Sequence, residues 1–170
     1  KKSKSLVIGI PRETWKQENR VCLTPEAVEL LVNNDHEVII ETNAGKEASY
    51  SDNDYSECGG IITEKTEEVF QSDVVLKVAP LTKKELGFLK GNQVIFSSLH
   101  VAAQNEEYFR ELIRKKITGF AFESIKDKYD RFPVVRSMSE IAGITSIVLA
   151  SEYLSNVHSG KGVLLGGITG

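Results

Sequence analysis

The chain has 170 residues, 41% of them hydrophobic, which is enough for one α/β domain with its own core and a piece of a second. Its formal charge of −3 gives no basic field for nucleic acid, and we expect no apolar run long enough to cross a bilayer, so neither nucleic acid nor a membrane is an expected partner. Two cysteines, Cys22 and Cys58, are too few for a disulfide framework or a zinc site, and no signal peptide precedes them. We therefore expect no metal site and a cytoplasmic location.

Short β-branched runs alternate along the chain with helical patterns. This alternation is typical of a mostly parallel sheet with crossover helices, so we predict an α/β fold. The predicted strands are Leu6–Ile10, Glu37–Glu41, Asp73–Val78, Gln93–Ser97 and Ile117–Phe122.

Start signals predict three helices in the first part of the chain. An N-cap side chain accepts a hydrogen bond from the first turn of a helix, proline fits the first helical position, and a capping box adds an acidic residue three positions later. The pairs with these signals are Thr24 and Pro25, Ser51 and Asp54, and Thr82 and Glu85.

Two further helices follow, separated by a linker. A longer helical stretch runs from Met138 to about Asn156, after a charged segment rich in turn formers at 126–132. We therefore place one domain at residues 1–132 and assign 133–170 to a second part. The earlier of the two helices is predicted from one apolar face formed by Tyr108, Phe109, Leu112 and Ile113.

The glycines near the end of the sequence do not form a dinucleotide-binding fingerprint. That fingerprint needs three glycines spaced G-x-G-x-x-G, and here Gly160 and Gly162 are followed by Leu165. We interpret the segment as a connector or turn, and expect any nucleotide-binding core to lie beyond Gly170.

Arg20 and His100 are the candidate functional residues that stand out from the pattern. Each lies in a short run after a predicted strand, where a βα unit presents side chains to a cleft. A guanidinium matches a carboxylate, and histidine is the side chain whose unperturbed pKa lies nearest neutrality. Together they predict a carboxylate clamp and an acid/base.

Six segments, in this order, resemble the amino-terminal part of alanine dehydrogenase. The same family contains the α subunit of the proton-translocating nicotinamide nucleotide transhydrogenase. The segments are Ile8–Thr14, Glu18–Pro25, Leu76–Val78, Leu99–Ala103, Met138–Gly143 and Gly162–Gly167.

The resemblance implies the substrate domain of a two-domain dehydrogenase, with a Rossmann-like (flavodoxin-like) fold and helices on both faces of the sheet. It makes 1–132 the N-terminal substrate domain and 133–170 a hinge helix with the start of a truncated NAD-binding domain. NAD is then bound mainly by the missing C-terminal part, so this chain alone is expected to be inactive. The implied reaction is the oxidative deamination of L-alanine to pyruvate and ammonia, and a homo-oligomer is expected.

The resemblance also implies roles for particular residues. Arg20 is similar to the residue that binds the substrate carboxylate, and the alternative is a surface arginine paired with Glu18 or Glu13. His100 matches the histidine that holds the substrate oxygen and moves protons, and the alternative is a core histidine. Glu123 resembles a residue that lines the interdomain cleft, and is equally interpreted as a capping carboxylate.

The resemblance also assigns two residues to the cofactor side of the cleft, and at one further position this chain departs from the family. Met138 and Ser139 resemble residues that line the cofactor side of the cleft, with Ser139 touching NAD. Alanine dehydrogenases resemble one another in a second lysine two residues after the one at Lys77, and this chain has Ala79 there. Either Lys77 binds the substrate, or a lysine of the following turn (Lys83 or Lys84) does, or Lys77 is structural.

Two other functions stay open beside alanine dehydrogenase. The transhydrogenase α subunit tolerates a residue other than lysine at position 79, but lacks the histidine that matches His100. A binding or assembly module whose chemistry has decayed is the second alternative, and Ala79 is the feature that supports it.

Overall fold

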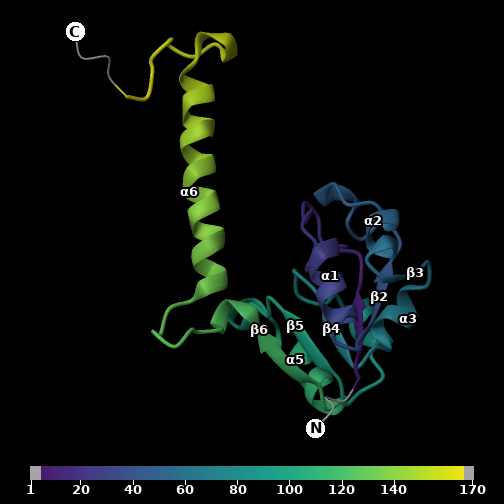
Figure 1. Ribbon diagram of the computed structural model, residues 1–170. Helices are drawn as coiled ribbons and strands as arrows, with labels where there is room; N and C mark the ends of the chain where they lie inside the picture. The colour runs from purple at the N-terminus through teal and green to yellow at the C-terminus, as the bar shows by residue number, and fades with distance from the viewer. Residues whose placement is uncertain (1–4, 167–170) are drawn as a thin grey trace. The chain divides into compact units, whose positions relative to one another are not determined.

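The computed structural model describes residues 5–166 and divides the chain into two compact units, Lys1–Ser124 and Ile125–Gly170 (Figure 1). The first unit contains a six-stranded sheet in the order β3-β2-β1-β4-β5-β6, with every neighbouring pair parallel. This is the strand order of a doubly wound Rossmann sheet, and it confirms the predicted α/β fold. The strands are β1 (Val7–Ile10), β2 (Glu37–Glu41), β3 (Ile61–Thr63), β4 (Val74–Leu76), β5 (Val94–Ser97) and β6 (Thr118–Ala121).

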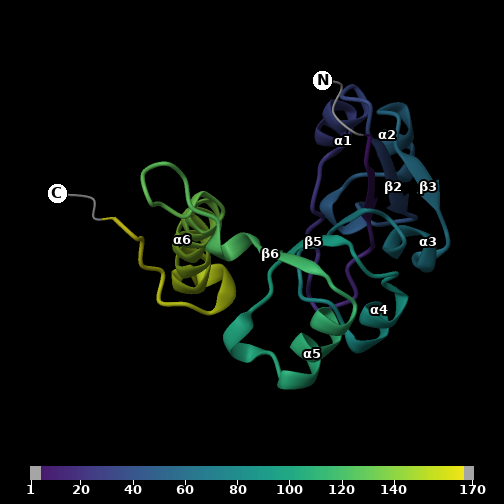
Figure 2. The ribbon, with the colours of Figure 1, turned by 90° about the horizontal axis from the view of Figure 1, so that it is seen from below.

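Helices cover both faces of this sheet, as expected, because alternate strand residues feed two separate cores. Ile8 and Ile10 of β1 pack with Val28 of α1 and Tyr55 of α2. On the opposite face, Val75 of β4 packs with side chains of the other helices. Figure 2 shows α1 and α2 on one side of the strands and α4 and α5 on the other. The helices are α1 (Pro25–Val32), α2 (Asp52–Glu57), α3 (Thr66–Phe70), α4 (Lys83–Phe88) and α5 (Glu106–Arg114).

The predicted helix starts are confirmed by the cap geometry. The Thr24 side chain accepts a hydrogen bond from the backbone N–H of Ala27, and Pro25 is the first residue of α1. Complete capping boxes begin α2 at Ser51 and α4 at Thr82. Polar residues with short side chains therefore set where these helices begin.

Three details of the prediction for the first unit are wrong. The prediction omitted β3 and α3, which are only three and five residues long and carry no start signal of their own. It also placed Ile113 on the apolar face of α5, but Ile113 is 75% exposed while Tyr108 and Leu112 are buried. Ile113 directly follows Leu112, so it lies about 100° around the helix from that buried position.

The second unit contains one long helix, α6 (Pro133–Leu154), which begins five residues earlier than the predicted stretch because Pro133 occupies its first position. The expectation that the sequence has no apolar run long enough to cross a bilayer is wrong. By length and composition alone, α6 is long and apolar enough to cross a bilayer, because it has 22 residues and contains an 18-residue window with a mean hydropathy of 1.3. The interior helix of a soluble protein passes the same test, so the finding is weak evidence for a membrane span.

Candidate functional site

The centre of the sheet in the first unit is its topological switch point. The chain leaves β1 toward β2 on one side, while β4 lies on the other side of β1. Ligands of open α/β sheets bind beyond the carboxyl ends of the strands at such a point. The segments that leave β1 and β4 begin at Pro11 and Lys77, so both meet there.

Glu13 joins these two segments. Its Oε1 accepts a hydrogen bond from the backbone N–H of Val78 at 2.5 Å, and its Oε2 accepts one from Lys77 Nζ at 2.5 Å. Burial raises the pKa of Glu13, and the adjacent Lys77 ammonium opposes that shift. Sequence reasoning missed this role, although Glu13 lies within the first of the six segments that carry the resemblance.

Lys77 is fully buried between two carboxylates. Besides its contact with Glu13, its Nζ lies 3.6 Å from Glu85 Oε1, and the side chains of all three residues are at least 95% buried. Glu85 is itself held by the Thr14 hydroxyl at 3.0 Å and by the backbone N–H of Thr82 at 2.7 Å. This is the geometry of a structural lysine that fixes the two segments to each other, and its role toward a substrate stays a prediction.

The neighbouring lysines are engaged elsewhere. Lys83 forms an ion pair with Glu107 at 2.8 Å on an exposed surface, and Lys84 lies over the ring of Phe88. Ala79, which stands where the family lysine was expected, is 7% exposed. None of these residues lines the cleft described next.

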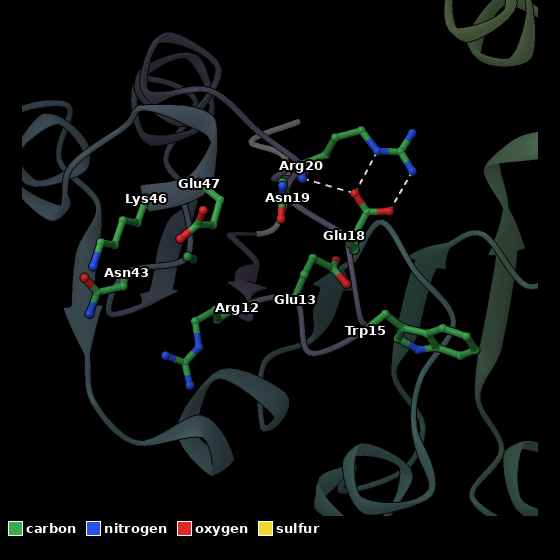
Figure 3. Close-up of a pocket in the computed structure, with 10 residues that line it drawn as sticks. Arg12, Glu13, Trp15, Glu18, Asn19, Arg20, Asn43, Lys46 and Glu47 are labelled. Atoms are coloured by element: carbon green, nitrogen blue, oxygen red, sulfur yellow. Dashed lines mark hydrogen bonds and ion pairs between the residues drawn. The ribbon is translucent and has the colours of Figure 1, made fainter. Parts of the chain in front are cut away.

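A cleft of ≈ 390 Å³ opens between the segment 12–20, which follows β1, and the segment 43–47, which follows β2 (Figure 3). Its walls carry Arg12, Arg20 and Lys46 together with Glu13, Glu18 and Glu47, so acidic and basic groups are balanced. Arg20 therefore lies in a cavity near the switch point, where a ligand is expected.

Arg20 forms an ion pair with the carboxylate of Glu18. Its Nε and Nη2 donate to the two oxygens of Glu18 at 2.8 and 2.6 Å, and Figure 3 shows the two side chains facing each other. This hydrogen bond holds the pKa of Glu18 below its usual value. The pairing is the one expected of the structural alternative, and a role of Arg20 as a clamp for a substrate carboxylate stays a prediction.

Trp15 forms another part of the cleft wall. Its indole N–H donates to the carbonyl of Pro80 at 2.8 Å, which adds a second connection between the segments after β1 and β4. The side chain is 48% exposed, so one part of the ring faces solvent.

His100 follows β5 and is exposed, so it is not the core histidine of the alternative interpretation. Its backbone has φ 44° and ψ 50°, in the left-handed region. His100 does not line the cleft that contains Arg20. Both residues nevertheless lie beyond carboxyl ends of strands in one sheet, where β4 alone separates β1 from β5.

Glu123 caps the loop that carries His100. Its Oε1 accepts hydrogen bonds from the backbone N–H groups of Leu99 at 3.0 Å and His100 at 2.9 Å. Its Oε2 is buried and has no hydrogen-bond partner within residues 5–166. The geometry is that of the capping carboxylate, and a role at an interdomain cleft stays a prediction.

Met138 and Ser139 lie in α6 and belong to the second unit. Met138 is 38% exposed and Ser139 is exposed. The structure describes the two units separately, so the predicted cofactor contacts of both residues stay predictions.

Comparison with known families identifies the chain. The family model described as "Alanine dehydrogenase/PNT, N-terminal domain" matches residues 9–142. The chain belongs to this family.

Members of the family resemble the chain over nearly its whole length. Alanine dehydrogenases of Staphylococcus saprophyticus and Methanococcus maripaludis are 37% and 39% identical to it, each over 97% of this chain and 44% of their own length. A solved L-alanine dehydrogenase superposes with a TM-score of 0.88 at 34% identity, over 95% of this chain and 45% of that protein. The chain thus spans less than half the length of these relatives.

A transhydrogenase is also similar in structure. The Sinorhizobium meliloti transhydrogenase gives a TM-score of 0.64 at 25% identity, over 69% of this chain and 35% of its own. The likeness is therefore weaker and covers less of the chain than that to the L-alanine dehydrogenase.

Proposed function

We propose that this chain is the N-terminal substrate domain of an NAD-dependent alanine dehydrogenase. The observation that carries the proposal is the match to alanine dehydrogenases over 97% of the chain, supported by the TM-score of 0.88. The substrate is then a small amino acid or keto acid, which binds near the switch point of the sheet. On this proposal 1–132 is the substrate domain and 133–170 continues toward the cofactor domain.

Arg20 supplies the substrate clamp on this proposal. The carboxylate of alanine or pyruvate displaces that of Glu18 and takes over both of its hydrogen bonds to the guanidinium. The Arg20 side chain is 53% exposed, so a substrate carboxylate can reach the guanidinium from solvent. Glu18 is only 14% exposed and must turn toward water when it is displaced, because a buried carboxylate without a partner is unfavourable. Holding the carboxylate at two points orients the α-carbon, which lowers the barrier of the chemical step.

His100 supplies proton transfer on the same proposal. The oxidised amino acid is an imine, which water attacks before it collapses to the keto acid and ammonia, and these steps require proton transfer near neutral pH. An exposed imidazole beyond the carboxyl end of β5 can exchange protons with solvent between turnovers.

This sheet does not itself fit a dinucleotide, although its strand order is that of dinucleotide-binding domains. Such domains approach the pyrophosphate with glycines in the turn after the first strand. Here that turn carries Pro11, Arg12 and Glu13, and the Glu13 side chain spans it to reach the segment after β4. NAD, which accepts the hydride, is therefore assigned mainly to the part of the protein outside this chain, with Met138 and Ser139 as the contacts from this chain.

The transhydrogenase α subunit is the second candidate, favoured by Ala79 at the position of the expected substrate lysine. A transhydrogenase passes hydride between two nicotinamides, so it needs neither a substrate clamp at Arg20 nor an acid/base at His100. For either function we propose a cytoplasmic homo-oligomer. The two free cysteines and the apolar side chains that α6 exposes in this chain support that proposal.

The test is a pair of assays on the complete protein. Pyruvate reduction with NADH and ammonium should proceed, and hydride exchange between NADH and an NADP analogue should not. The Arg20→Lys variant should raise the KM for pyruvate at unchanged melting temperature, because lysine cannot form the two-pronged contact. Arg110→Lys is the matched control, since Arg110 also grips a glutamate through Nε and Nη2 but on the outer face of α5.

His100→Ala completes the test. Turnover should fall by about two to four orders of magnitude while folding is unaffected. Exchange activity without pyruvate reduction would assign the chain to a transhydrogenase. If the folded wild-type protein showed neither activity, the remaining function would be the binding or assembly module whose chemistry has decayed.

A further inference from the structure

We propose that Glu123 is a positioning residue that holds the backbone of His100 in its left-handed conformation and thereby aims the imidazole. The inference rests on the proposed function for the role of His100. It adds to that function a residue that touches no reacting atom.

The loop after β5 is fixed on both sides of His100. On the amino side, the single oxygen Oε1 of Glu123 accepts from two successive backbone N–H groups, those of Leu99 and His100. On the carboxyl side, the carbonyl of His100 accepts from the N–H of Ala103 at 2.7 Å, within the 3-10 turn Val101–Ala103. The peptide groups before and after the histidine are therefore both held.

The register of the sheet brings Glu123 to this loop. Strands β5 and β6 pair up to Ser97 and Ala121, so Leu99 and Glu123 each lie two residues beyond the last pair. A carboxylate in this place reaches N–H groups that no longer have a strand partner. The contact thus follows from the parallel pairing of the two strands and does not depend on the second unit.

The conformation that Glu123 holds is uncommon for a residue with a side chain. With φ at 44°, the Cβ of His100 leaves the backbone in a direction different from the one an extended residue would give. Such conformations persist where the surroundings over-determine them, and they cluster at functional sites. Loss of the Glu123 contact would let the loop relax toward negative φ and turn the imidazole away.

The second oxygen of Glu123 adds no hydrogen bond to the fold of residues 5–166. Oε2 is buried without a hydrogen-bond partner in the described part of the chain, and an unpaired buried acceptor is unfavourable. The proposed role therefore rests on Oε1, which accepts both N–H bonds of the loop.

The test compares Glu123→Ala with Glu123→Gln in the complete protein. Glutamine keeps an oxygen that can accept both N–H bonds, and alanine does not. We expect Glu123→Ala to lower kcat by about tenfold to a hundredfold with little change in KM, because a misplaced acid/base slows the chemical step. Glu123→Gln should restore kcat to within about threefold of the wild type.

The matched control is Glu64, an exposed glutamate that directly follows β3, the strand at the opposite edge of the sheet from β6. Glu64→Ala and Glu64→Gln should leave kcat unchanged. A loss of melting temperature in Glu123→Ala with unchanged kcat per folded molecule would overturn the proposal, because a purely structural cap predicts that result. Equal loss of kcat in the alanine and glutamine variants would overturn it as well.

Amide hydrogen exchange separates a failure of this inference from a failure of the proposed function. Glu123→Ala should speed exchange at the amides of Leu99 and His100 by about tenfold or more, and Glu123→Gln should not. This readout needs no catalytic activity. If the wild-type protein does not reduce pyruvate, the proposed function fails and the exchange data still decide whether Glu123 holds the loop; unchanged exchange in Glu123→Ala would refute the positioning itself.

Discussion

At the scale of single residues, the burial of Lys77 is the feature that sequence reasoning could not settle. A lysine at the end of a predicted strand is compatible with a substrate contact or a structural pair, because the sequence does not show which carboxylates surround it. Its two partners, Glu13 and Glu85, lie 64 residues before it and 8 residues after it in the chain. The ion-pair partner of Arg20 was easier to predict, because Glu18 is two residues away and was one of the two carboxylates that the sequence suggested.

Substitution of Lys77 tests its structural role. Lys77→Met keeps the length of the side chain and removes the ammonium, which leaves Glu13 and Glu85 buried without their cation. The free energy of unfolding should fall by about 3–5 kcal/mol, the usual effect of removing one partner of a buried ion pair. Urea denaturation measures it. Lys83→Met removes an exposed ion pair on the neighbouring helix and should leave the midpoint unchanged; a similar midpoint for both variants would contradict the structural assignment of Lys77.

At the scale of elements, the helix starts with a capping residue were predictable, and the short elements β3 and α3, which have no such local signal, were not. Thr24, Ser51 and Thr82 each satisfy their cap through residues within three positions, so the signal is local and present in the sequence. In contrast, β3 exists because it pairs with β2, and that pairing depends on the whole sheet. The loop at His100 is of the same kind, because its conformation depends on a glutamate 23 residues away.

The cap of α4 gives a prediction at this scale. The Thr82 hydroxyl accepts a hydrogen bond from the backbone N–H of Glu85, and the Glu85 carboxylate accepts one from the N–H of Thr82. Thr82→Ala should lower the free energy of unfolding by about 1 kcal/mol, because the first turn loses an acceptor. Chemical denaturation with Ser56→Ala as control checks this, since Ser56 is exposed inside α2. An equal effect of the two substitutions would show that the cap is not the cause.

At the scale of the whole molecule, the sheet has the strand order of dinucleotide-binding domains but lacks their glycine-rich turn after the first strand. The composition and the alternation of elements predicted the α/β class, and the order of the six segments predicted the family. The sequence predicted that the run with Arg20 faces a cleft, but it did not predict the opposite wall, because that wall is formed by the segment 43–47 after β2, which is remote from Arg20 in the sequence.

The assignment of NAD to a part of the protein outside this chain can be checked directly. The turn after β1 carries Pro11, Arg12 and Glu13 in place of glycines, and the glycines of residues 160–166 lack the third position of the fingerprint. The 170-residue chain should therefore bind NADH no more tightly than about millimolar. Isothermal titration calorimetry on the chain is the measurement. A micromolar isotherm would place a nucleotide site within these residues and contradict the assignment.

The position of Trp15 allows ligand binding in the cleft to be followed by intrinsic tryptophan fluorescence. The chain contains one tryptophan, and its indole lies in the wall of the cleft, half-exposed, with its N–H on the carbonyl of Pro80. Tryptophan fluorescence of the chain therefore arises from this one place. A carboxylate that draws Arg20 away from Glu18 changes the charges on the same cleft wall as the ring. Intensity and emission wavelength should therefore respond to a ligand in this cleft without a label, a cofactor or turnover. Trp15 also lines a second cavity, beside α4 and α5, so a ligand bound there should change the emission as well.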